Sequence, residues 1–413
     1  MTTDLLIIGG GPAGYTAAIE AANAGAKVRL FEKQWLGGTC LNAGCIPTKC
    51  LLEGSGLLQK IKKANYFGID APSPSVNFKR MAQRKNIVVS KLGKGLEKEL
   101  TDGNIDIIRE NISLTDAIKQ SAKVIIATGT SPRVLPDTIS TDDILNIENI
   151  PESIKIIGAG AVGLEMATLF CQLGSKVTVA EIADQILPFA AAPEVARELQ
   201  KILERQGIKF EIGEQVSPLN PPEGGLNTPE LTTLSCVGRI YNNAGLAEAG
   251  VALGPKGEVV TDDYFQTNLP GVYAAGDITG KFLLAHVAYA QGRAAALNAF
   301  SGKETVDYSA VPFCVFTDPV FASVGKTGGA KVLTAPYSQL GTAQAKGNTE
   351  GFIRAVLLED EQTIAGIQII GPGAAELIST ATIIVQKRMT LKDLQKTIFT
   401  HPTLGEIFAL LIN

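Results

Sequence analysis

A repeated segment constrains the fold more than any other feature of the chain. Residue 154 aligns with residue 5, and the match runs without a gap to residues 181 and 32. Each copy has a short, mostly apolar run, a glycine-rich turn, a helical stretch and a second apolar run, which is the pattern of a βαβ unit. Because the crossover in such a unit is right-handed, its strands are parallel. The repeat therefore predicts an α/β chain with two doubly wound sheets.

The remainder of the chain sets the number of domains. A chain of 413 residues exceeds what one hydrophobic core usually serves, so two or three domains are expected. Residues 216–230 are rich in proline and glycine and are predicted to form a loop. The mixed α/β stretch from residue 307 onward has no glycine-rich turn of its own, which makes it a candidate third domain.

Charge and composition exclude several classes of function. The net charge is −4, and no run of lysine and arginine is long enough to follow a nucleic-acid backbone. The first apolar run is broken at Gly9, so it is too short for a signal or membrane segment. Six cysteines are too few for a disulfide-stapled secreted scaffold. We expect a cytoplasmic protein that binds neither nucleic acid nor membrane.

Both glycine-rich turns have the spacing of a dinucleotide site. Their glycines are Gly9, Gly11 and Gly14 in the first copy, and Gly158, Gly160 and Gly163 in the second. Glycine permits the tight turn and the close approach of a pyrophosphate to the free N–H groups of the helix that follows. Glu32 and Glu181 end the second strands, where a carboxylate can bind a ribose diol. An ordinary surface glutamate is the alternative interpretation of each.

The acid of the second copy also bears on cofactor choice. A 2′-phosphate would meet the like charge of Glu181, and no arginine follows in residues 182–184. The sequence therefore favours NAD over NADP at the second turn.

A cysteine pair stands between the two copies. Cys40 and Cys45 are separated by four residues, and Gly44 would ease the local distortion that a small disulfide ring needs. Glycines before Cys40 suggest a helix start, where the dipole lowers a thiol pKa. Zinc binding and two buried structural thiols are the alternatives, although no second cysteine pair supports a zinc site.

These motifs carry a resemblance to a known family. The segment at residues 37–49, GGTCLNAGCIPTK, is similar to the redox motif of the pyridine nucleotide-disulfide oxidoreductases, in the form found in the dihydrolipoamide dehydrogenases. Residues 127–129, 238–239 and 267–277 resemble further motifs of that family. The resemblance implies FAD on the first turn, NAD on the second, a redox-active disulfide between Cys40 and Cys45, and a homodimer.

The resemblance also implies a domain division and cofactor contacts. Residues 1–145 would form the FAD-binding domain with the redox pair, 146–260 the NAD-binding domain, 261–306 a central segment that returns to the FAD domain, and 307–413 a C-terminal α+β dimerisation domain. FAD would contact Gly9, Gly11, Pro12, Ala13, Gly14, Glu32, Lys33, Gly38, Thr39, Lys49, Ala127, Thr128, Gly129, Gly276, Asp277, Leu284, Ala285 and His286. NAD would contact Gly158, Gly160, Val162, Gly163, Glu181, Gly238 and Arg239.

Four further residues receive catalytic roles from the resemblance. Lys49 would lie near the reactive nitrogen of the flavin and pair with Glu165 from the second helix. His401 would act as the base and Glu406 would orient it, in the active site of the partner subunit. The helix that begins near Leu284 would direct its N-terminus at the flavin ring.

The implied reaction oxidises a dithiol and reduces NAD. A dihydrolipoyl group, carried by a lipoyl domain of a 2-oxo acid dehydrogenase or glycine cleavage system, would attack Cys40 while Cys45 faces the flavin. Alternatives are another NADH-dependent disulfide reductase, or a flavoprotein subunit without catalysis. The chain departs from the family pattern in a shortened second domain, around residues 206–239.

Overall fold

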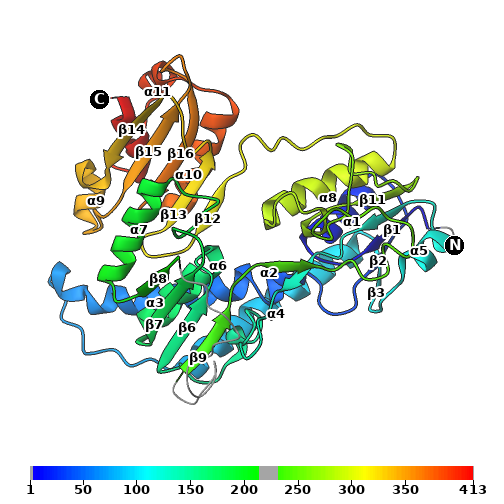
Figure 1. Ribbon diagram of the computed structural model, residues 1–413, viewed down its shortest axis with the longest axis horizontal. Helices are drawn as coiled ribbons and strands as arrows, with labels where there is room; N and C mark the ends of the chain where they lie inside the picture. The colour runs from blue at the N-terminus through cyan, green and yellow to red at the C-terminus, as the bar shows by residue number, and fades with distance from the viewer. Residues whose placement is uncertain (1–2, 214–230, 413) are drawn as a thin grey trace.

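The chain folds around three main β-sheets. The computed structural model describes residues 3–213 and 231–412, so the predicted loop at 216–230 lies outside the described residues. Figure 1 shows the first sheet at the right, the second below the centre and the third at the upper left. The two doubly wound sheets and the separate C-terminal α+β part confirm the predicted fold class.

The first sheet is parallel throughout. Its strands follow the order β11 (Val272–Ala274), β4 (Val124–Ile126), β1 (Leu5–Ile8), β2 (Val28–Phe31) and β3 (Asp106–Ile108). The four residues of β1 are buried, as expected for a central parallel strand covered on both faces. Helices α1 (Pro12–Asn23) and α8 (Ala285–Ala299) pack against each other beside it. Strand β11 comes from beyond the second unit, so the chain returns to this sheet.

The second sheet repeats the same arrangement. Its parallel strands follow the order β8 (Lys209–Ile212), β7 (Lys176–Glu181), β6 (Ser153–Ile157) and β9 (Leu231–Ser235). Helix α6 (Ala161–Leu173) is mostly apolar and buried, and it ends at the left-handed glycine Gly174. Helix α7 (Pro193–Arg205) is amphipathic and follows β7. A short antiparallel pair, β5 (Thr130–Pro132) with β10 (Arg239–Tyr241), joins this part to the first sheet.

The third sheet is antiparallel and belongs to the C-terminal part. Its strands follow the order β12 (Phe313–Val315), β13 (Phe321–Gly325), β16 (Ile364–Ile370), β15 (Phe352–Leu357) and β14 (Lys331–Pro336). Helices α10 (Ala374–Gln386), α9 (Gly341–Ala345) and α11 (Leu391–Lys396) and the 3₁₀ helix Leu404–Ile412 complete this part. Its own apolar core includes Ile353, Ile367 and Phe408.

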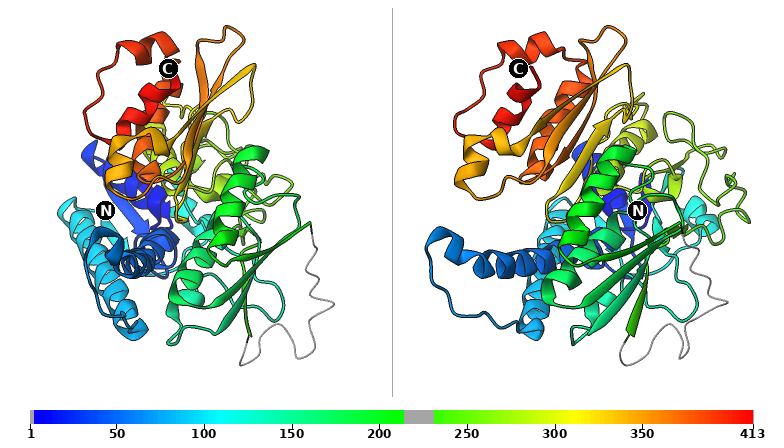
Figure 2. Two further views of the ribbon diagram at one scale, coloured as in Figure 1. Left: turned by 90° about the vertical axis from the view of Figure 1, so that its left-hand side faces the viewer. Right: turned by 60° about the vertical axis from the view of Figure 1, so that its left-hand side comes forward.

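Helices from the first unit reach across to the second. Helix α2 (Gly38–Asn42) is followed by α3 (Cys45–Lys62), which packs against α4 (Phe78–Asp102) and against α6. Ser55 Oγ on α3 donates to Gln172 Oε1 on α6 at 2.6 Å. The right view in Figure 2 shows α3, in blue, extending away from the first sheet. Within the described residues, which also include α5 (Leu114–Gln120), no helix is long and apolar enough to cross a membrane.

Candidate active site

The two cysteines of the redox motif lie on separate helices. Cys40 is the third residue of α2, and Cys45 is the first residue of α3. Gly44 interrupts the helical path between them with φ of −149° and ψ of −110°. A Cβ atom on Gly44 would lie 3.0 Å from the carbonyl oxygen of Thr39, so a side chain there would crowd the turn. The break lets the Cys40 thiol donate a hydrogen bond to Cys45, and both cysteines are free thiols.

The pKa values of the two thiols are driven apart. The hydrogen bond donated by Cys40, together with its burial, raises the pKa of Cys40. The same hydrogen bond and the positive charge of Lys49 lower the pKa of Cys45 to about 7, although burial opposes them. A helix does begin before Cys40, as predicted. The lowered pKa, however, is that of Cys45, because Cys45 accepts the hydrogen bond and lies near the positive charge of Lys49.

A partly buried ion pair lies one turn beyond Cys45. Lys49 Nζ lies 2.8 Å from both carboxylate oxygens of Glu165 on α6, which confirms the predicted pairing. Only 7% of the Glu165 side chain is exposed. The backbone N–H of Phe316 also donates to Glu165 at 3.2 Å, and Lys49 Nζ lies 4.4 Å from the centre of the Phe316 ring. All three main parts of the molecule therefore meet at Lys49.

Two glycines of the first glycine-rich turn, Gly9 and Gly14, have no room for a side chain. A Cβ atom on Gly14 would overlap the carbonyl oxygen of Gly9, and one on Gly9 would overlap that of Ala127. Pro12 and Ala13 open α1, and Gly11 is its N-cap. The backbone N–H groups at this helix start can therefore be approached closely by a phosphate.

Polar groups around the first turn fit FAD. Thr128 Oγ1 is buried, and the structure gives it no hydrogen-bond partner among the described residues. Gly129 beside it has open space where a side chain would be. Glu32 follows β2 and accepts a hydrogen bond from Gly10 N at 2.7 Å, which fixes its carboxylate at the turn. Gly38 and Thr39 begin α2 next to Gly11, whereas Lys33 is exposed.

Asp277 lies at the end of the first sheet, beyond β11. Burial raises the pKa of Asp277, and Thr130 Oγ1 donates to its Oδ2 at 2.9 Å. Gly276 precedes it at a φ of 82°, where a Cβ atom would lie 2.9 Å from that of Ala13. The Gly276 N–H donates to the buried Gln291 Oε1 at 2.7 Å. These contacts hold the carboxylate of Asp277 beside the first turn.

Helix α8 begins where the sequence predicted. Leu284 is its N-cap and Ala285 its first residue. His286 is exposed, and its Nε2 lies 2.9 Å from the carbonyl oxygen of Pro312. Partial desolvation of the ring lowers the pKa of the His286 imidazole, although the contact with the Pro312 carbonyl opposes this shift. The free N–H groups at the start of α8 can stabilise a negative charge that lies near them.

Arg239 lies with the first unit. Its Nε donates to Thr130 Oγ1 at 2.6 Å and its Nη2 to the Thr130 carbonyl oxygen at 2.8 Å. Nη2 also lies 3.4 Å from Thr39 Oγ1, next to Cys40. Gly238 precedes it, exposed and with a φ of 102°. The sequence grouped both residues with the second turn, whereas the contacts of Arg239 are with Thr130 and Thr39 of the first unit.

The second turn repeats the geometry of the first. A Cβ atom on Gly163 would overlap the carbonyl oxygen of Gly158, while Gly160 faces open space. Glu181 ends β7 and accepts a hydrogen bond from Ala159 N at 2.7 Å. Val162 is 44% exposed in the first turn of α6. A free helix start beside a fixed carboxylate fits a dinucleotide such as NAD.

A tyrosine pair near the cysteines was missed in the sequence. Tyr15 OH on α1 donates to Tyr289 OH on α8 at 3.0 Å, and the ring centres are 5.9 Å apart. Burial raises the pKa of both hydroxyls, and the nearby Cys40 sulfur adds to that effect. The two residues are 274 positions apart, so no local pattern joins them.

His401 and Glu406 form the predicted pair. His401 Nδ1 lies 2.9 Å from Glu406 Oε1, and the second carboxylate oxygen accepts from Thr403 N at 2.9 Å. These contacts lower the pKa of Glu406 and fix the orientation of the imidazole. The His401 side chain is 78% exposed. In Figure 1 the C-terminal segment lies on the third sheet, well away from α2.

Known proteins share this arrangement. Residues 3–292 match the family model described as pyridine nucleotide-disulphide oxidoreductase, and residues 311–412 match the dimerisation domain of the same family. A dihydrolipoyl dehydrogenase of Chlamydia trachomatis is 38% identical over 98% of this chain and 95% of its own length. One from Bacillus subtilis is 35% identical over 97% of this chain and 96% of its own length.

Solved structures agree with these relatives. LpdA from Mycobacterium tuberculosis superimposes with a TM-score of 0.89 at 24% identity, covering 100% of this chain and 99% of its own. The flavoprotein disulfide reductase RclA from Escherichia coli, as its Cu(II) complex, gives a TM-score of 0.88 at 27% identity over 100% of this chain and 99% of its own. The chain belongs to the pyridine nucleotide-disulphide oxidoreductase family.

Proposed function

We propose that the chain is a dihydrolipoyl dehydrogenase, which oxidises a protein-bound dihydrolipoyl group and reduces NAD. One observation carries the proposal: Cys40 and Cys45 contact each other where α2 meets α3, one turn before the ion pair between Lys49 and Glu165. The dihydrolipoyl dehydrogenases at 33–38% identity over nearly the whole chain support the choice of substrate. A cytosolic location is part of the proposal.

The two cysteines have different tasks in this reaction. In the oxidised enzyme they form a disulfide, and one substrate thiolate attacks Cys40 to give a mixed disulfide, releasing Cys45 as thiolate. The second substrate thiol then displaces Cys40, so the substrate leaves as a disulfide and both enzyme cysteines are reduced. The positive charge of Lys49 beside Cys45 stabilises the departing thiolate, which favours Cys45 as the leaving group of the pair.

Other residues place the cofactors and the charge. FAD on the first turn supplies the transfer of the electron pair from the dithiol to NAD. Lys49, held by Glu165, keeps a positive charge beside Cys45 and stabilises its thiolate. Glu32 and Asp277 bind the first cofactor, and Glu181 binds the ribose of the second.

The base is proposed to come from a second subunit. His401 is exposed and oriented by Glu406, and the C-terminal segment of the chain lies away from α2 in Figure 1. A second copy that docks through the dimerisation domain can present this imidazole to the substrate thiols, where it accepts their protons. The functional unit is therefore a homodimer.

The test replaces one cysteine and uses another as its control. Cys45→Ser should abolish NAD reduction by dihydrolipoamide while the purified protein stays yellow with bound FAD. Cys50→Ser changes a thiol five positions further along the same helix and should leave turnover close to that of the unchanged protein. Undiminished activity of Cys45→Ser, or a protein that takes up no FAD, would overturn the proposal.

A further inference from the structure

The segment between β7 and α7 contacts the second glycine-rich turn. Both backbone polar groups of Ala159, the central residue of the Gly158–Gly160 turn, are bonded, one by Glu181 at the end of β7 and the other by Leu187 of this segment. The Ala159 N–H donates to the Glu181 carboxylate at 2.7 Å, and the Ala159 carbonyl accepts from Leu187 N at 3.1 Å. The position of this turn therefore depends on the position of residues 182–192, which we call the β7–α7 segment.

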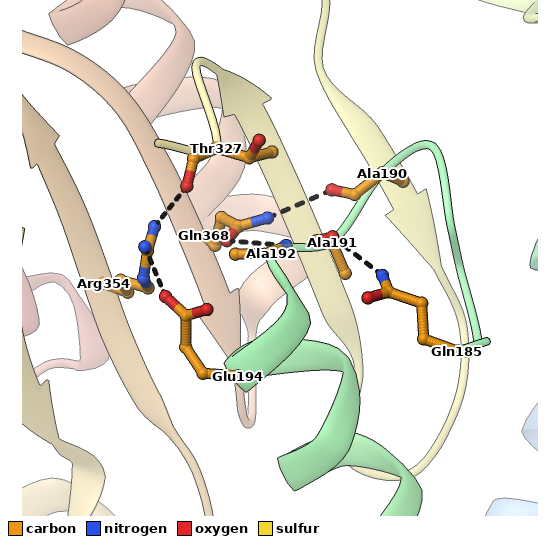
Figure 3. A network of polar contacts seen from close by, with 8 residues as sticks. All are labelled: Gln185, Ala190, Ala191, Ala192, Glu194, Thr327, Arg354 and Gln368. Atoms are coloured by element: carbon orange, nitrogen blue, oxygen red, sulfur yellow. Dashed lines mark hydrogen bonds and ion pairs between the residues drawn. The ribbon is translucent and has the colours of Figure 1, made fainter. Parts of the chain in front are cut away.

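A buried side chain from the third sheet holds this segment. Gln368 on β16 is 0% exposed. Its Nε2 donates to the Ala190 carbonyl at 3.1 Å, and its Oε1 accepts from Ala192 N at 3.3 Å, as Figure 3 shows. Gln185 Nε2 donates to the Ala191 carbonyl at 3.2 Å from within the segment. The backbone of residues 190–192 is thus bonded on both sides.

A second contact secures the start of α7. Arg354 on β15 is 4% exposed and pairs with Glu194 in the first turn of that helix. Its Nη1 donates to the Thr327 carbonyl oxygen at 2.9 Å. The third sheet therefore holds both the end of the β7–α7 segment and the helix after it.

The segment contains a residue that needs such support. Leu187 has a φ of +48°, a left-handed conformation that is unfavourable for a leucine. Its side chain is 2% exposed, in the core of the second unit. Ala190 N and Ala191 N both donate to the Leu187 carbonyl oxygen, at 3.0 and 3.1 Å. By holding residues 190–192, Gln368 therefore stabilises the backbone conformation in which the Leu187 N–H donates to the Ala159 carbonyl oxygen.

We propose that Gln368 is a positioning residue for NAD(H): from the third sheet, it fixes the turn on which the dinucleotide binds. The inference rests on the proposed function in placing NAD at the second turn. It makes the affinity for NADH depend on a residue that lies outside the nucleotide-binding unit and touches no part of the dinucleotide.

The experiment separates nucleotide binding from thiol chemistry. In the FAD-loaded protein, Gln368→Leu keeps the volume of the side chain and removes both hydrogen bonds. The NADH dissociation constant, measured by fluorescence titration, should rise about tenfold, because the buried N–H of Ala192 and the partly buried carbonyl of Ala190 lose their partner. The rate at which dihydrolipoamide reduces the bound flavin in a stopped-flow mixing experiment should stay unchanged.

A matched control comes from the next residue of the same strand. Ile369→Ala removes apolar contacts in the core of the third sheet and should lower the melting temperature without changing NADH affinity. Should Gln368→Leu fail to fold, Gln368→Met keeps an unbranched side chain of similar length, removes both hydrogen bonds, and should weaken NADH binding to the same extent. Equal NADH affinity in the unchanged and Gln368 proteins would overturn the inference. An unchanged protein that binds no NADH would instead contradict the proposed function.

Discussion

The two βαβ units hold their glycine-rich turns in the same way. In the first, the Gly10 N–H donates to Glu32 at 2.7 Å and the Gly10 carbonyl accepts from Gly37 N at 2.8 Å. In the second, Ala159 makes the corresponding bonds to Glu181 and to the N–H of residue 187. The residue whose N–H bonds the carbonyl oxygen of the turn has a positive φ in both units; it is Gly37 in the first and Leu187 in the second.

The units differ in the segment that follows this residue. In the first unit the residue is Gly37, and the chain continues directly into α2 with Cys40. In the second unit it is Leu187, and the chain continues to the contacts with Gln368 on the third sheet. The same βαβ arrangement can therefore be followed by a redox-active cysteine pair or by a segment bonded to another sheet. Which of the two occurs depends on the residues that follow the second strand of the unit.

The largest effects should come from the crowded glycines. Gly14→Ala and Gly163→Ala each place a Cβ atom against a backbone carbonyl that cannot move away. Gly14→Ala should yield a protein without FAD, measured by its absorbance. Gly163→Ala should remain yellow and be reduced by dihydrolipoamide, but lose about a hundredfold or more in affinity for NADH. Loss of FAD from Gly163→Ala would show that the two units do not work separately.

The acid of the second unit should have the next largest effect. Glu181→Ala removes a charged acceptor from Ala159 and from the ribose. A hydrogen bond to a charged group contributes about 1.5–3 kcal/mol, so the KM for NADH should rise at least about tenfold. The preference for NADH over NADPH should shrink, because the like charge is gone. Steady-state kinetics with both nucleotides checks this, and an unaltered preference would contradict the assignment of Glu181.

The charge beside the first unit's thiol gives a smaller, directional effect. Lys49→Met removes the cation that lowers the pKa of Cys45 and leaves the Glu165 carboxylate, which raises it. A rise of about one unit from 7 would reduce the thiolate fraction at pH 7 roughly fivefold. Alkylation of Cys45 by iodoacetamide, followed by mass spectrometry, measures this fraction.

Glu165→Gln is the control for Lys49→Met, because it should shift the pKa of Cys45 in the opposite direction. It removes the negative charge and should move the pKa of Cys45 downward. If both variants shifted the alkylation profile in the same direction, the charges at this pair would not control the thiol.

The smallest effect concerns Leu187, whose N–H bonds the carbonyl oxygen of Ala159 in the second turn. Leu187→Ala and Leu187→Gly both lose buried apolar contacts in the second unit. At a φ of +48°, glycine avoids a cost of about 1–2 kcal/mol that alanine retains. Leu187→Gly should therefore be the more stable of the two by about 1 kcal/mol, measured by urea unfolding. If Leu187→Ala proved more stable than Leu187→Gly, the left-handed backbone conformation of residue 187 would be contradicted.

The sequence predicted what depends on local pattern. The two βαβ units and the placement of Glu32 and Glu181 at strand ends follow from short runs of residues, whereas the start of α8 was indicated by the family resemblance. The pairing of Lys49 with Glu165 joins residues 116 positions apart, so only the family resemblance could indicate it.

The features that the sequence missed depend on tertiary packing. The contacts of Arg239 with Thr130 exist because β10 pairs with β5 of the first unit. Gln368 lies on a buried strand where its neighbours are apolar, and nothing nearby in the sequence indicates its bonds to residues 190–192. Which cysteine would start the longer helix depended on the interruption at Gly44.

The pH dependence of Cys45 alkylation in the reduced, FAD-loaded protein tests the account most directly. Because only the thiolate reacts, the rate should rise as the pH increases through the pKa of Cys45. The account predicts a midpoint at about pH 7. A midpoint near 9.0, the ordinary value of the thiol, would contradict the assignment of Cys45 as the activated thiol of the pair.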